Sequence, residues 1–122
     1  MDALTFVHAR LGMALLLYLV ICGIWGVVEA LRGRPASGAY LGALFIATGM
    51  ALVQALLGII LLLNGRMPGE WLHLVYGILV LGTLPVAYSY ARTKSGKTAM
   101  VIYAVATLIA AAAAVRALGT GG

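Results

Sequence analysis

The chain has 122 residues, of which 64% are hydrophobic and 9% charged, and its mean hydropathy is +1.10. A soluble domain of this length could not bury so much apolar surface, so the composition excludes a soluble globular protein. A net charge of +5 would suggest a nucleic-acid partner in a soluble chain. In a membrane protein, basic residues at helix ends serve topology and contact anionic headgroups, so we expect lipid and no nucleic acid as the partner.

Four apolar stretches are each long enough to cross a bilayer as a helix, because about 20 helical residues span its hydrocarbon core. They cover approximately residues 5–31, 39–63, 71–91 and 98–118. None of them alternates with the period of two that a barrel strand would show, so we predict helices. The loops between them are short, which predicts an all-α, integral membrane, up-down four-helix bundle that forms a single domain over residues 1–122.

The first stretch carries His8 near its start and ends at the basic segment Arg32–Pro35, whose glycine and proline are helix-stop residues. Glu29 lies one turn before Arg32, and we expect these two side chains to form an ion pair. The second stretch contains three glycines and one polar residue, Gln54. Small residues and a single amide are typical of close packing between transmembrane helices.

The third stretch carries His73 near its start and Pro85 in its second half, where we expect a kink. The basic loop 92–97 follows. The fourth stretch is rich in alanine and has few large side chains, which suits it to close packing against a neighbouring helix. We expect the segment 119–122 to be a frayed end.

The basic residues are divided unequally between the two ends of the predicted bundle. The first and third loops together hold five cations, whereas the other side has three cations and two acidic residues to offset them. The positive-inside rule therefore places the first and third loops in the cytoplasm. Both termini then lie on the outer, periplasmic side of an inner (cytoplasmic) membrane. The five cations are Arg32, Arg34, Arg92, Lys94 and Lys97.

His8 and His73 are the only histidines of the chain, and each lies near the start of a span that runs from outside to inside. We expect both about one helical turn, on the order of 5 Å, beneath the outer surface. In an up-down bundle these two spans are diagonal, and facing imidazoles at matched depth suit a haem with two histidine ligands. We therefore predict that His8 and His73 are the axial ligands of one haem b.

Four further residues have predicted roles around this haem. Each histidine is followed four residues later, on the same helix face, by a glycine that would give the macrocycle room against the backbone. These glycines are Gly12 and Gly77. Arg10 and Arg66 lie near the outer surface, where we expect them to neutralise the haem propionates.

Two other interpretations of the histidines stay open. Each histidine could be only a polar anchor at the membrane interface, and Arg10 could merely extend its side chain from the lipid to the headgroups. Alternatively, each histidine could bind the magnesium of a separate chlorophyll-type pigment. Gln54 is interpreted as a helix-packing hydrogen bond.

Part of the chain resembles the haem A synthase family. That family has a Gln-x-x-Leu-Gly helix, a loop, and then a helix that opens with a haem-ligand histidine. The segments Gln54-Ala55-Leu56-Leu57-Gly58 and Trp71-Leu72-His73-Leu74 are similar to this pattern. His8-Ala9-Arg10-Leu11-Gly12 resembles the family's His-Arg-x-x-Gly helix, with one residue inserted before the arginine. The resemblance covers roughly residues 5–91 and implies a four-helix haem-binding unit with His8 and His73 as ligands.

The chain differs from this family at a position that the family uses for its reaction. Its enzymes place a carboxylate about one turn before a ligand histidine, whereas Leu4 and Thr5 occupy that offset before His8. Glu70 precedes His73 by three residues, but on the helix where the catalytic carboxylate is not expected. The resemblance therefore implies the bundle and not the reaction, and small b-type cytochrome subunits are equally compatible.

Three functions follow from these observations. The leading hypothesis is a small haem b-binding membrane subunit that carries electrons near the outer face, with other subunits of an electron-transport complex as partners. The second is an accessory subunit, poor in cofactors or pigment-binding, of a respiratory or photosynthetic complex. The third is a haem-modifying enzyme like haem A synthase, although an electron-transfer or accessory role is favoured over an enzyme.

Overall fold

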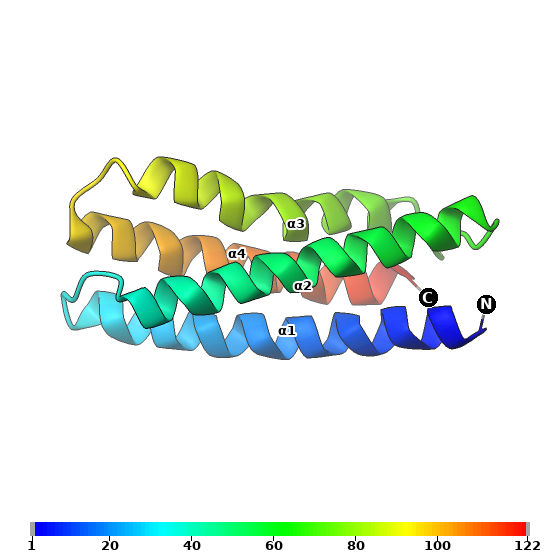
Figure 1. The fold of residues 1–122 in the computed structure, drawn as a ribbon, viewed down its shortest axis with the longest axis horizontal. Helices are drawn as coiled ribbons and strands as arrows, with labels where there is room; N and C mark the ends of the chain where they lie inside the picture. The colour runs from blue at the N-terminus through cyan, green and yellow to red at the C-terminus, as the bar shows by residue number, and fades with distance from the viewer. Residues whose placement is uncertain (1, 122) are drawn as a thin grey trace.

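The computed structural model describes residues 2–121, and all its regular structure is helical. The four helices are α1 (Asp2–Leu31), α2 (Gly38–Leu63), α3 (Leu72–Ala91) and α4 (Gly96–Gly121). Each is long and apolar enough to cross a membrane, which confirms the prediction of four spans in a multi-pass membrane protein. The helices lie side by side, successive helices run in opposite directions, and the start of α1 and the end of α4 lie at the same end (Figure 1).

The fourth helix packs closely against two neighbours, α1 and α3, whereas α2 packs more loosely on α1 and only lightly on α3. Within residues 2–121, the backbone of α1 does not come close to that of α3, nor the backbone of α2 to that of α4, so each of these pairs is diagonal. The close packing of α4 follows from its small side chains, because alanines let two helix backbones approach. Seven alanines of α4 are buried: Ala99, Ala104, Ala106, Ala110, Ala111, Ala113 and Ala114.

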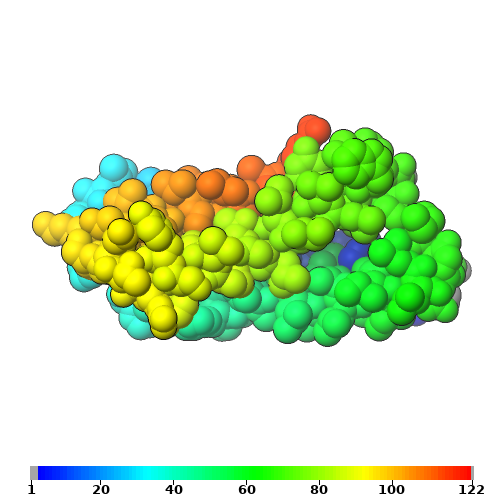
Figure 2. Space-filling model, turned by 90° about the horizontal axis from the view of Figure 1, so that it is seen from above, coloured from blue at the N-terminus to red at the C-terminus, as the bar shows by residue number. Residues whose placement is uncertain are grey.

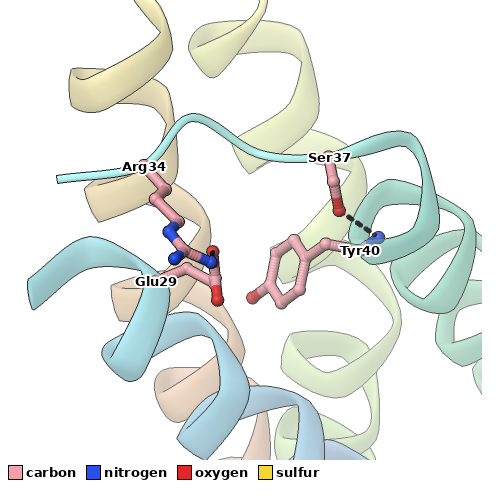
Figure 3. A network of polar contacts seen from close by, with 4 residues as sticks. All are labelled: Glu29, Arg34, Ser37 and Tyr40. Carbon is pink, nitrogen blue, oxygen red and sulfur yellow. Dashed lines mark hydrogen bonds and ion pairs between the residues drawn. The ribbon is translucent and has the colours of Figure 1, made fainter. Parts of the chain in front are cut away.

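The loop between α1 and α2 shows why the predicted partner of Glu29 is wrong. Glu29 pairs with Arg34, at 3.9 Å, and not with Arg32 (Figure 3). Gly33 adopts a positive φ of 66°, and the chain turns back so that the Arg34 N–H donates to the Glu29 carbonyl. This turn brings Arg34 over the end of α1. Ser37 then starts α2 by accepting a hydrogen bond from the Tyr40 N–H, at 3.1 Å.

The expected end of the fourth helix also changes. The fourth helix extends to Gly121, so residues 119–121 of the predicted frayed end are helical, and Gly122 lies outside the described residues. The reason is the loop before α3, where the N–H groups of Gly69 and Glu70 donate to the carbonyls of Gly121 and Thr120. These bonds occupy carbonyls that a free helix end would leave without partners. The third helix continues through Pro85 without a break.

Candidate functional site

The two histidines lie on diagonal helices and meet in the space between them. His8 belongs to the first turns of α1, and His73 to the first turn of α3. Their ring centroids are 6.1 Å apart, and the ring planes are 73° from parallel. Since the backbones of α1 and α3 are not in contact, the two side chains bridge the bundle across its diagonal.

Both rings line one cavity of about 600 Å³, to which all four helices contribute. This volume lies in the range of roughly 300–1,000 Å³ that is usual for cofactor and small-molecule sites. The cavity opens between α2 and α3, and atoms of the first turns of α1 are visible through this opening (Figure 2). Its lining is mainly aliphatic, which is the surface that an apolar macrocycle requires.

The hydrogen bond of His73 determines which ring nitrogen is free. Nδ1 lies 2.7 Å from the carbonyl oxygen of Ala117 in α4. A carbonyl oxygen can only accept, so the neutral ring carries its proton on Nδ1 and donates it to Ala117. Nε2 then has a free lone pair. A histidine whose Nδ1 is bonded to a backbone carbonyl is in the usual state of a metal ligand.

His8 has a different set of contacts. Gln54 of α2 donates a hydrogen bond from Nε2 to the backbone carbonyl of His8, at 2.7 Å. Among the described residues, two buried side-chain polar atoms have no hydrogen-bond partner, and these are His8 Nδ1 and Gln54 Oε1. Both residues line the cavity. Buried polar atoms without partners are rare in proteins, so this contact between α1 and α2 leaves hydrogen-bonding capacity unused.

Glycines leave room for both imidazoles. A Cβ on Gly121 would lie 2.8 Å from Cε1 of His73, and a Cβ on Gly58 would lie 3.3 Å from Cε1 of His8. Gly77 faces open space, and both Gly77 and Gly12 line the cavity. A Cβ on Gly12 would meet the Gln54 amide at 2.9 Å, so this glycine also makes room for the residue that contacts His8.

The sequence analysis missed Gly58, Gly121 and Ala117 as site residues, although an internal repeat marks the first two. The pattern His-x3-Gly-x3-Leu-x2-Leu begins at His8 and again at His73. The pattern Tyr-x2-Ala-x2-Ile-Ala-x3-Ala-x6-Gly runs from Tyr40 to Gly58 and again from Tyr103 to Gly121. Buried positions match as well: Leu19 with Leu84, Tyr40 with Tyr103, Ala47 with Ala110 and Ala51 with Ala114.

The repeat means that the hairpins α1–α2 and α3–α4 surround the cavity in equivalent ways. Each contributes a histidine from its first helix and, from its second helix, a glycine beside that histidine. The residue one turn before this glycine also contacts the histidine in both hairpins. In α4 it is Ala117, through its carbonyl, and in α2 it is Gln54, through its side chain.

The two arginines that were predicted to neutralise the propionates lie differently with respect to the cavity. Arg66 lines the cavity, in the loop between α2 and α3. Arg10 is not part of the described lining, and its guanidinium lies over the Phe6 ring, 5.1 Å from the centroid. Helix geometry explains this, because two residues along an α-helix rotate the side-chain direction by about 200°. Arg10 therefore lies on the opposite side of α1 from His8.

The described residues contain no group of three or more histidine, cysteine, aspartate or glutamate side chains that could hold a metal ion. Of these four residue types, the two facing imidazoles are the ones that line the cavity, as far as the structure describes it. They are sufficient for a metal whose other ligands come from a macrocycle, because a haem iron needs only axial ligands from the protein.

Comparisons of the chain with protein families, with curated proteins and with solved structures find no match.

Proposed function

We propose that this chain is a haem b-binding membrane subunit in which His8 and His73 are the two axial ligands of one iron. The observation that carries the proposal is the separation of the two rings, 6.1 Å between centroids. Imidazoles that bind one iron from opposite sides, each through a bond of about 2 Å, place their centroids roughly 6 Å apart. The rings thus have the spacing that a shared iron requires.

The surroundings of the rings support the same proposal. The His73 ring is fixed by its bond to the Ala117 carbonyl, which leaves Nε2 free to bind iron. Gly77 leaves open space at the cavity, where a flat macrocycle can approach the backbone. Arg66 lines the cavity and can contribute positive charge to the propionates. Arg10, which lies over Phe6, is not assigned to them.

A haem held by His8 and His73 would accept and donate one electron reversibly, and the part of the two histidines would be to hold it in the bundle. We propose that the chain forms an up-down bundle in an inner membrane with both termini on the outer side. The haem then lies near the outer face, within reach of other subunits of an electron-transport complex. No substrate-binding side chain is needed, because electron transfer requires only proximity between cofactors.

The alternative functions lose part of their support. The accessory interpretation took the alanine-rich fourth helix and the glycines of the second helix as packing surfaces. Of these two, α4 is packed between α1 and α3, whereas a Cβ on Gly42 or Gly49 of α2 would meet no atom within 4 Å. Separate pigments on the two histidines would need two macrocycles, but both rings face one cavity. The resembled family of haem-modifying enzymes places a carboxylate about one turn before a ligand histidine. The lining, as far as the structure describes it, contains none, and Glu70 is exposed.

The absorption spectrum of the purified protein tests the proposal. We expect a sharp α-band after dithionite reduction, as for a six-coordinate haem b. His73→Ala and His8→Ala should each remove the six-coordinate spectrum while the helix content by circular dichroism stays the same, because apolar packing holds the bundle. Val75→Ala is the matched control, since it is close to His73 in α3 but does not line the cavity.

Two results would contradict the haem proposal. One is a colourless protein from haem-replete cells that also takes up no added haem. The other is a reduced spectrum that His73→Ala and His8→Ala leave unchanged.

A further inference from the structure

A second cavity lies between α2 and α3, at the end of the bundle away from the histidines. Its volume is about 260 Å³. The rings of Phe45 and Tyr88 meet across it edge to face, 5.3 Å apart, and both are partly exposed. The seam between α2 and α3 is the least closely packed of the four seams between adjacent helices. In a membrane, this cavity is therefore an apolar recess that opens toward lipid.

The same end of the molecule carries most of the positive charge. Its two loops and helix ends contain five cations and one acidic residue, Glu29, which pairs with Arg34. The two loops lie side by side, since the Lys97 side chain lies 3.9 Å from the position of a Cβ on Gly33. The positive charges of both loops are thus brought together at one membrane surface. They belong to Arg32, Arg34, Arg92, Lys94 and Lys97.

Arg92 connects this charge to the apolar recess. It follows Tyr88 by four residues and Ser89 by three, and both of these line the cavity. Its backbone is still helical, with φ −63° and ψ −15°. Residues three and four apart lie on one helix face, so Arg92 continues the cavity-lining face of α3 by one further turn toward the polar surface. The exposed residue Arg92 thus lies one turn beyond the part of α3 that lines the apolar recess.

We propose that this part of the α2–α3 seam binds one anionic phospholipid, whose acyl chain occupies the cavity and whose phosphate is bound by Arg92. Guanidinium groups bind phosphate oxygens in a bidentate way, and basic sites between transmembrane helices are a recurrent place for anionic headgroups. A lipid combines in one molecule the apolar chain and the negative charge that the two observations require. The site does not depend on the haem proposal, because none of its residues contacts either histidine.

Lipid retention by the detergent-solubilised protein tests this site. The protein is titrated with phosphatidylglycerol or with phosphatidylcholine of the same acyl chains, and bound lipid is counted by native mass spectrometry. We expect one phosphatidylglycerol to bind at least several-fold more tightly than phosphatidylcholine. Arg92→Gln should abolish this preference. Arg32→Gln is the matched control, because Arg32 follows α1, which is diagonal to α3, and it removes the same charge at the same end.

A second variant separates the acyl chain from the headgroup. Thr48 lines the cavity, and Thr48→Leu adds apolar bulk to it, so we expect weaker retention of both lipids at this site. The proposal is overturned if the wild-type chain binds the two lipids equally, which would mean that only the acyl chain is recognised. It is also overturned if Arg32→Gln and Arg92→Gln reduce binding equally, since the effect would then be the general charge of this end.

Discussion

Two glycines set the positions of the histidine rings, and Gly121 is the more sensitive of the two. A Cβ there would lie 2.8 Å from Cε1 and 2.9 Å from Nδ1 of His73, which is closer than such atoms can approach. We therefore expect Gly121→Ala to displace the ring and weaken its bond to the Ala117 carbonyl. The measurement is the ¹⁵N chemical shift of the His73 ring, in which both nitrogens should move toward the average of the two tautomers. Haem binding should weaken in parallel.

Gly119→Ala is the control for this prediction. A Cβ on Gly119 has no atom within 4 Å, and alanine favours a helix over glycine by up to about 1 kcal/mol. Gly119→Ala should therefore leave the His73 shifts unchanged and the bundle at least as stable. Identical shifts in wild-type chain and Gly121→Ala would show that Gly121 does not position the ring.

The site residues differ in how far a sequence can reveal them. His8 and His73 were predictable because a polar ring in an apolar span is conspicuous and the span lengths give their depth. Ala117 could not be predicted as a site residue, because it acts through its backbone carbonyl, and every residue has such a group. Gly58 and Gly121 are hidden among many other glycines until the repeat aligns them. Arg10 was assigned by nearness in sequence, although helix rotation takes it to the opposite side of α1.

Among the helices, the contact of α1 with α4 and α2 depends on Gly26. A Cβ there would collide with the Tyr40 hydroxyl and lie 3.2 Å from the Cα of Ala104. Tyr40 is fully buried, and the clash with a backbone atom can be relieved only by moving a helix. We expect Gly26→Ala to lower the free energy of unfolding by about 1–3 kcal/mol, as overpacking of a core does. Thermal unfolding in detergent, followed by circular dichroism, measures this loss.

Gly42→Ala provides the comparison within the same fold. Gly42 of α2 has open space where its Cβ would be, so this variant should unfold at the wild-type temperature or slightly above it. Equal stabilities for Gly26→Ala and Gly42→Ala would contradict the close packing of α1 on its neighbours.

Helix existence and approximate length were predictable because the bilayer thickness imposes about 20 apolar residues on each span. The positions of the helix ends were less predictable. Gly119 and Gly121 look like helix breakers, and only the hydrogen bonds from Gly69 and Glu70 explain why α4 continues to its last described residue. The Glu29–Arg34 pair was missed for a similar reason, since the turn at Gly33 changes which cation lies near Glu29.

At the scale of the whole molecule, two equivalent hairpins pack unequally. The small side chains of α4 let it close against α1 and α3, whereas α2 has larger residues at several matching positions, such as Met50 for Ala113 and Gln54 for Ala117. The seam between α2 and α3 stays open as a result, and both cavities border it. The closely packed helix α4 thus forms one side of the histidine cavity, and the loosely packed helix α2 leaves space at its seam with α3.

The orientation of the protein in the membrane determines which membrane face each cavity lies near. Cysteine labelling tests this orientation. Cys22 is the only native cysteine and is buried, so Cys22→Ala gives a suitable background. Asn64→Cys places a thiol in an exposed position at the histidine end, and Ser95→Cys places one at the basic end. The excess of cations around Ser95 should keep that end in the cytoplasm. A membrane-impermeant maleimide should therefore label Asn64→Cys in intact cells, and Ser95→Cys only after permeabilisation. The reverse pattern would place the histidine cavity at the cytoplasmic face, and the electron donor would then have to be sought on that side.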